Sequence, residues 1–216
     1  MTDTDNLPDT RSLIERGVDG QRLLSVFNFI AANDERHDQS AWGGLDADKL
    51  REAHSNGDLD MELKVLPFEG SVYAIDNKVK DIDCGSTGCF AGWTVLLAGG
   101  KPVIQEYQLN EEHQIDFSQV LMPDGHGVQR VATVAADLLF GPYTEARYFA
   151  DDLFNGDNSH SPAFLREFVL RVLNGATYHD LQAWIEDADD YEGDWDYEDH
   201  PDYEPITFDE GLGVYV

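Results

Sequence analysis

The chain has 216 residues, a formal net charge of −29, and 42% apolar and 11% aromatic residues. This apolar content excludes wholesale disorder, and the length suits one domain of ordinary size, with or without a tail. So much negative charge disfavours direct binding to nucleic acid or to an anionic membrane, and favours a basic protein surface as the partner.

Cysteine usage and apolar runs indicate the compartment. The sequence holds two cysteines, Cys84 and Cys89, too few for a disulfide scaffold. Its first residues show no basic region followed by an apolar one, so no signal peptide is expected. The longest apolar run, residues 93–98, is about a third of the ~20 residues that a membrane span needs. The sequence therefore predicts a cytoplasmic protein with no membrane segment.

Apolar residues at a spacing of i, i+3, i+4 and i+7 predict helices in five places along the chain, and a shorter helix and the helix after the cysteines bring the expected number to seven. Capping signals support several of them, including Asp19 as an N-cap, Pro162 after Ser161, and a capping box from Thr177 to Asp180. In chain order, the predicted helices cover residues 23–31, 47–54, 86–98, 128–139, 144–153, 162–173 and 177–185.

Strand patterns are weaker than helix patterns. Residues 62–66 and 71–75 flank a Pro-Phe-Glu-Gly turn and predict a hairpin, while residues 103–107 and 214–216 are candidate edge strands. We therefore expect a mainly α fold of the α+β class. A helical domain over residues 1–185 would carry a small antiparallel hairpin or sheet, and an acidic segment over residues 186–216 would follow it.

The most unusual local sequence is D-C-G-S-T-G-C-F-A-G-W, residues 83–93. Ser86 or Thr87 is a possible N-cap of the helix that follows. Gly88 and Gly92 are four residues apart, so one face of that helix is nearly bare and another backbone can approach it closely. The pattern predicts a central, tightly packed helix in which the cysteines serve as small apolar residues.

Three chemical alternatives remain open for the cysteines. Cys84 at a helix N-terminus would have a lowered pKa, and its C-G-S context with Trp93 resembles papain-like peptidases, with His113 or His126 as the base. The family's C-G-S-C-W spacing is, however, broken by two inserted residues. A metal site would need a second ligand pair beside C-x4-C. A Cys84–Cys89 disulfide would be unusual in a reducing cytoplasm.

A family resemblance lies in the same stretch. C-G-S-T-G-C-F-A-G-W-T resembles the C-G-T-x-x-C-x-A-G-W signature of small acidic proteins encoded by actinobacteriophages and their hosts. The later A-A-D-L-L-F-G, residues 135–141, with Ala146 and residues 153–154, continues the likeness, which covers about residues 84–155. It implies a phage or phage-derived origin, and thus the host cell cytoplasm. It supplies no activity.

No cofactor or metal site is predicted. The sequence has no Walker motif, no G-x-G-x-x-G and no G-x-S-x-G, and its histidines form no i, i+4 pair. Residues 128–154 have the layout of a helix-turn-helix, but the second helix carries three acidic residues against a single Arg147, and phosphates would repel it.

The acidic segment carries the strongest functional signal. From Glu186 to Glu210 there are thirteen acidic residues and no Lys or Arg. If extended at ~3.3 Å per residue, its carboxylates would be spaced by about 6 Å, within a factor of two of the ~3.4 Å between charges on one DNA strand. Interspersed aromatic residues could anchor an interface. The predicted binding residues are Asp187, Asp189, Asp190, Tyr191, Glu192, Asp194, Trp195, Asp196, Tyr197, Glu198, Asp199, Asp202, Tyr203 and Glu204.

These observations predict a non-enzymatic binding protein that engages a basic surface, as an inhibitor or nucleic-acid mimic directed at a host DNA-binding or defence protein. A cysteine hydrolase with Cys84 as nucleophile and a virion assembly or structural component are the alternatives. Adaptation to high salt is a further explanation of the acidity. We also expect that deleting residues 186–216 leaves the helical core folded. The oligomeric state is left open.

Overall fold

The computed structural model describes residues 10–37, 42–66, 70–81, 88–110, 114–141, 145–154, 162–189 and 204–216. These residues contain seven α-helices, none of which is long and apolar enough to cross a membrane. The α-helices are α1 (Gly20–Ala31), α2 (Ala47–Asn56), α3 (Phe90–Leu97), α4 (Val131–Phe140), α5 (Tyr148–Phe154), α6 (Pro162–Leu173) and α7 (Tyr178–Asp189). Short 3₁₀ helices are η1 (Asp34–Arg36), η2 (Asn77–Lys80), η3 (Glu106–Asn110) and η4 (Glu145–Arg147).

Strands make up more of the fold than the sequence predicted. An antiparallel five-stranded sheet has the order β2-β3-β4-β6-β7, and β1 with β5 and β8 with β9 form two small antiparallel pairs. The strands are β1 (Gly44–Asp46), β2 (Met61–Leu66), β3 (Gly70–Ile75), β4 (Lys101–Gln105), β5 (Gln114–Asp116), β6 (Gln119–Leu121), β7 (Val128–Arg130), β8 (Phe208–Asp209) and β9 (Val214–Tyr215).

The expected mainly helical fold with a small hairpin or sheet is therefore wrong, and the protein is a mixed α/β fold. The predicted β2–β3 hairpin is present, but it forms only the beginning of the sheet. Strand β4 was expected at an edge and lies in the middle, between β3 and β6. Strands β6 and β7 have three residues each, too few to show alternation in the sequence.

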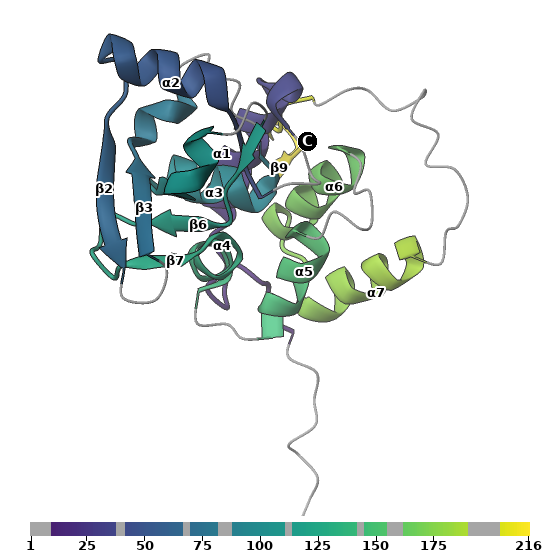
Figure 1. Ribbon diagram of the computed structural model, residues 1–216. Helices are drawn as coiled ribbons and strands as arrows, with labels where there is room; N and C mark the ends of the chain where they lie inside the picture. Colours follow the sequence, from purple (N-terminus) through teal and green to yellow (C-terminus); the bar gives the residue numbers. More distant parts are fainter. Residues whose placement is uncertain are drawn as a thin grey trace, which may run out of the picture.

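One face of the sheet packs on the helices. Ile75, Ile104 and Val120 lie on this face and belong to the same buried core as α3. Figure 1 shows α1, α3 and α4 beside the sheet, with α5, α6 and α7 farther from it. Seven of the eight residues of α3, from Phe90 to Leu96, are buried, which confirms the predicted central position of this helix.

Helix starts agree with the sequence where a local cap decides them. Asp19 caps α1 by accepting a hydrogen bond from the Arg22 N–H at 2.9 Å, and α6 begins at Pro162, both as predicted. Two predicted helices begin later than expected because strand pairing takes their first residues. Residues 128–130 pair with β6 as β7, and Gly88 pairs with His37, so α3 starts at Phe90 after the N-cap Cys89.

Helix α7 begins with the predicted capping box. The Thr177 N–H donates to the Asp180 carboxylate at 3.0 Å, and the Asp180 N–H donates to the Thr177 hydroxyl at 3.2 Å. These hydrogen bonds, first the backbone one and then that of the Thr177 hydroxyl, hold the pKa of Asp180 below its usual value. The carboxylate form therefore stabilises the folded state.

Replacing Asp180 with asparagine, which keeps an acceptor oxygen but loses the charge, should lower the free energy of unfolding by roughly 0.5 kcal/mol at pH 7. Because the folded-state pKa is depressed, this contribution is present above the unfolded pKa and disappears as the pH falls through the folded pKa, so the difference should shrink below about pH 4. Urea unfolding of both proteins between pH 3 and pH 7 measures it. Asp187→Asn, on the same helix, is the charge-matched control. An Asp180→Asn deficit that is equal at pH 3 and pH 7 would contradict the assignment.

Candidate functional site

The cysteine motif enters the core through Cys89. Its side chain is 1% exposed, and its Sγ lies 3.8 Å from the Trp42 carbonyl oxygen, a long contact of the kind that thiols make with buried backbone. Its backbone is the N-cap of α3, and its side chain makes no capping hydrogen bond. Cys89 thus has the packing role that the sequence predicted.

Gly92 makes the close backbone approach that the sequence predicted, whereas Gly88, expected on the same helix face, lies before the helix, which begins at Phe90. A Cβ added at Gly92 would lie 1.9 Å from the Trp42 carbonyl oxygen, so the segment before β1 runs directly against the helix backbone. A Cβ at Gly88 would lie 3.4 Å from the same oxygen, an ordinary contact. The structure therefore assigns the tight contact to Gly92, whereas the sequence treated both glycines alike.

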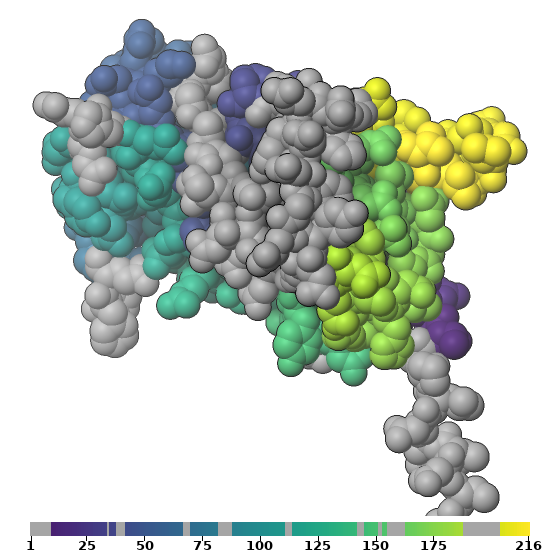
Figure 2. Space-filling model, turned by 90° about the vertical axis from the view of Figure 1, so that its right-hand side faces the viewer, coloured from purple at the N-terminus to yellow at the C-terminus, as the bar shows by residue number. Residues whose placement is uncertain are grey.

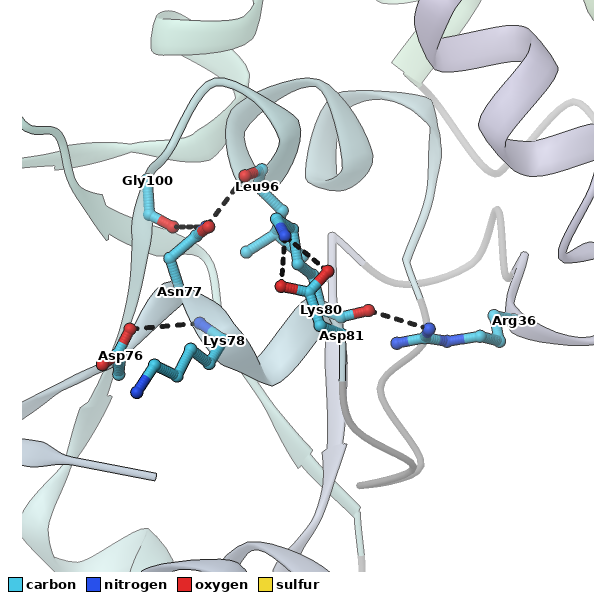
Figure 3. Close-up of polar contacts among 8 residues, drawn as sticks. All are labelled: Arg36, Asp76, Asn77, Lys78, Lys80, Asp81, Leu96 and Gly100. Carbon is cyan, nitrogen blue, oxygen red and sulfur yellow. Dashed lines mark hydrogen bonds and ion pairs between the residues drawn. The ribbon is translucent and has the colours of Figure 1, made fainter. Parts of the chain in front are cut away.

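Arg36 joins the two described flanks of the cysteine segment. Its guanidinium donates from Nη1 to the Lys80 carbonyl oxygen at 2.9 Å (Figure 3). Its own carbonyl oxygen accepts the Gly88 N–H at 3.1 Å. The guanidinium also lies 5.0 Å from the Trp93 ring centroid, a cation–π distance.

Helix η2 is held nearby because the Asn77 amide donates to the carbonyl oxygens of Leu96 at 2.8 Å and Gly100 at 2.7 Å. These contacts hold the backbone on both sides of the cysteine segment in place.

Replacing Cys89 with alanine should cost on the order of 1 kcal/mol, because it removes one small buried group. The expected readout is a slightly lower midpoint in chemical denaturation, with the same slope as the wild type. Ser118→Ala, at an exposed position, is a comparable single-atom deletion that should leave the midpoint unchanged. A Cys89→Ala protein that fails to fold would show that the thiol has a larger role than packing.

The structure leaves the other cysteine chemistry untested. Cys84 and His113 lie outside the described residues. The structure therefore gives no distances for a Cys84 nucleophile with His113 as its base, or for a Cys84–Cys89 disulfide. His126 is described, and it is exposed in the turn between β6 and β7. Among the residues with described positions, no group of three or more His, Cys, Asp or Glu side chains could hold a metal ion.

The predicted acidic binding residues lie mostly outside the described part of the chain. Asp187 is exposed near the end of α7, Asp189 is the last residue of that helix, and Glu204 is exposed where the description resumes. The other residues of the predicted set, from 190 to 203, are not described. The structure accordingly places the two ends of the acidic segment.

Near its C-terminal end the acidic segment docks on the body of the protein. Ile206 is 2% exposed and belongs to the main core. The Asn28 side chain on α1 pairs with its backbone in both directions, donating to the Ile206 carbonyl oxygen at 3.0 Å and accepting its N–H at 2.8 Å. The Asn174 side chain likewise donates to the Tyr215 carbonyl oxygen at 3.0 Å and accepts the Tyr215 N–H at 2.9 Å. Both ends of the acidic segment are thus held, a feature that sequence reasoning missed.

The C-terminal hairpin, β8–β9, presents apolar side chains to solvent. Phe208 is 52% exposed and Leu212 is 71% exposed, and Val214 and Val216 are also exposed. The Phe208 and Tyr215 rings pack edge to face with centroids 5.1 Å apart. In Figure 2 the hairpin, in yellow, projects beside α6. We call Phe208, Leu212, Val214 and Val216 the hairpin patch.

A separate pocket of about 500 Å³ opens on the sheet face that carries the small Val72, Ala74 and Val103 cluster. Two of the chain's five lysines, Lys64 and Lys101, line it, together with the glycine-rich turn between β6 and β7. The hydrogen bond and the charge of Lys64, and then the charge of Lys101, hold the pKa of Glu62 below its usual value.

Comparison of the chain with protein-family models, with curated proteins and with solved structures finds no match in any of the three.

Proposed function

We propose that the protein is a non-enzymatic, phage-type binding protein that engages a basic protein surface through the acidic segment and the hairpin patch. Its partner would be a host DNA-binding or defence protein, which it inhibits by occupying the surface that otherwise binds nucleic acid. The phage origin rests on the resemblance of residues 84–155 to the actinobacteriophage proteins. The remaining support comes from charge, attachment and exposed apolar surface.

The negative charge of the acidic segment indicates the class of partner, a basic protein surface. The acidic segment holds thirteen carboxylates between Glu186 and Glu210 without a balancing Lys or Arg, and the chain as a whole carries −29. Such a field accelerates encounter with a cationic surface and opposes approach to nucleic acid. The spacing of the carboxylates suits a surface that is built to contact phosphates.

Attachment at both ends is the observation that carries the proposal. A tail held at one end loses much conformational freedom on binding, and that loss weakens the complex. Here the chain leaves α7 and returns to Asn28, which holds Ile206 through two hydrogen bonds, while the Arg166 Nε donates to the Glu204 carbonyl oxygen at 3.2 Å. Anchoring both ends reduces the freedom that binding must remove.

The hairpin patch supplies apolar contacts, which the carboxylates of the acidic segment cannot make. Exposed ion pairs are worth little each, whereas buried aromatic and aliphatic anchors dominate binding energy at interfaces. Phe208 and Leu212 lie within nine residues of Glu204, next to the exposed Glu210. We therefore expect a partner whose basic surface surrounds an apolar depression.

The test uses two variants of equal net charge. In the segment variant, Asp190, Glu192, Asp194, Asp196, Glu198 and Asp199 are replaced by their amides. In the body variant, the same change is made at six exposed acidic residues elsewhere, namely Glu52, Asp58, Asp60, Glu106, Asp116 and Asp124. Binding to purified basic nucleoid proteins of an actinobacterial host is measured by calorimetry, with poly-L-lysine as a charge-only reference.

The segment variant should lose at least about tenfold more affinity than the body variant, equivalent to about 1.4 kcal/mol. Duplex DNA should compete with the wild-type protein, and the affinity should fall steeply with salt because exposed charges are screened within about 8 Å at physiological ionic strength. Equal losses in the two variants would show that overall charge, as in salt adaptation, explains the binding. Binding that DNA does not displace would reject nucleic-acid mimicry.

A further inference from the structure

The five-stranded sheet has one long open edge, strand β2. Within the described residues β2 pairs with β3 alone, and Figure 1 shows it at the margin of the sheet. Strand β7, at the other edge, has three residues and leads directly into α4. An edge strand presents alternate backbone N–H and C=O groups that another strand can pair with.

The side chains of β2 sort into two faces. Successive residues of a strand point to opposite faces, so Met61, Leu63 and Val65 share one face and Glu62 and Lys64 share the other. Leu63 is 53% exposed and Val65 is 76% exposed, large values for apolar side chains in a strand. Glu62 and Lys64 form an ion pair at 2.8 Å. The open edge is therefore apolar on one face and carries balanced opposite charges on the other.

We propose that β2 pairs with β2 of a second copy of this chain, antiparallel and centred on Leu63, which joins two five-stranded sheets into one. In this register Leu63 faces Leu63 of the second copy, Met61 faces Val65, and Glu62 faces Lys64. Side chains of a strand alternate between the two faces of a sheet, so an odd-numbered residue of one copy must lie opposite an odd-numbered residue of the other, and an even-numbered one opposite an even-numbered one. This register meets that condition, so the apolar side chains of both copies lie on one face of the joined sheet and the charged ones on the other. Each of the five pairs then matches apolar with apolar or negative with positive charge.

The side chains of β2 complement those of an antiparallel copy of the same strand, and this favours a second copy of the chain as the partner at the open edge. A lysine on an edge strand ordinarily opposes strand pairing because it brings an unmatched charge to the edge. Here the two-fold axis places Glu62 of one copy opposite Lys64 of the other, and it does so twice. The same axis places the two exposed leucines against each other. The pairing uses neither the acidic segment nor the hairpin patch, so it stands independently of the proposed function.

A charge-exchange experiment tests the register. Glu62→Lys places like charges opposite each other in a homodimer, and Lys64→Glu does the same with the opposite sign. Each variant alone should therefore be monomeric, whereas an equimolar mixture should form a heterodimer, in which both cross-strand pairs are again opposite in charge. Sedimentation at 0.15 M salt, where a Debye length of about 8 Å limits the repulsion between acidic chains, measures association from about 1 μM to about 1 mM.

Glu52→Lys and Lys78→Glu, which change the net charge equally at exposed positions outside β2, should dimerise like the wild type. Leu63→Cys in a Cys84→Ser background should form a disulfide with its own copy, since directly opposite residues lie about 4.5–5.5 Å apart. Val65→Cys should cross-link much more slowly. A wild-type chain that stays monomeric up to about 1 mM, or a mixture that associates no better than either variant alone, would overturn the proposal.

Discussion

Replacing Gly92 with leucine should unfold or aggregate the protein. Any side chain at this position must enter the space of the Trp42 carbonyl oxygen, which lies 1.9 Å from the position of a Cβ. Neither partner can give way easily, because the obstacle is backbone and because α3 is buried from Phe90 to Leu96. Overpacking ordinarily costs about 1–3 kcal/mol, and a backbone collision of this kind should reach or exceed the upper end of that range.

Gly92→Ala gives a finer measurement, since it adds only the colliding atom. On an exposed helix the same change would stabilise by up to about 1 kcal/mol, so the sign of the shift in thermal unfolding reports the contact. Gly88→Ala, just before the helix, is the control for the Trp42 contact, because its added Cβ meets the Trp42 oxygen at 3.4 Å and should be tolerated. Unchanged melting of Gly92→Ala would show that α3 does not lie against the segment before β1.

Ending the chain after residue 203 should destabilise the protein by about 3 kcal/mol or more. The truncation removes Ile206 from the main core, and losing most of a buried isoleucine side chain costs about 2–5 kcal/mol. It also leaves the Asn28 side chain without the backbone groups that it pairs with. The sequence alone had predicted that deleting residues 186–216 would leave the core folded, and the docking of Ile206 on α1 gives the reason to expect otherwise.

Chemical denaturation measures this effect against two reference proteins. The segment variant, which loses six charges but keeps residues 204–216, should unfold at the wild-type midpoint or slightly above it. Ile206→Ala in the full-length chain should reproduce a large part of the truncation effect. A truncated protein with the wild-type midpoint would mean that the C-terminal residues rest on the body without stabilising it.

The acidic segment could be found from the sequence, whereas its attachment could not. Clustered carboxylates are visible in any reading of residues 186–210, and they indicate the class of partner directly. Asn28 and Ile206 are 178 residues apart, and neither residue is unusual in its own sequence context. The hairpin patch was likewise missed, because exposed apolar residues near an end of the chain look the same in a sequence as buried ones.

By itself, the sequence determined the features that depend on residues a few positions apart. These include the caps at Asp19 and Thr177, the start of α6 at Pro162 and the β2–β3 hairpin. Only the tertiary structure decided that the hairpin extends into a five-stranded sheet, that residues 128–130 form a strand and that Ile206 returns to the core. The physical reason is the range of the interactions: a cap or tight turn is completed by groups a few residues away, whereas a three-residue strand is stable only as part of a larger sheet, and a buried side chain only against a core that distant segments form.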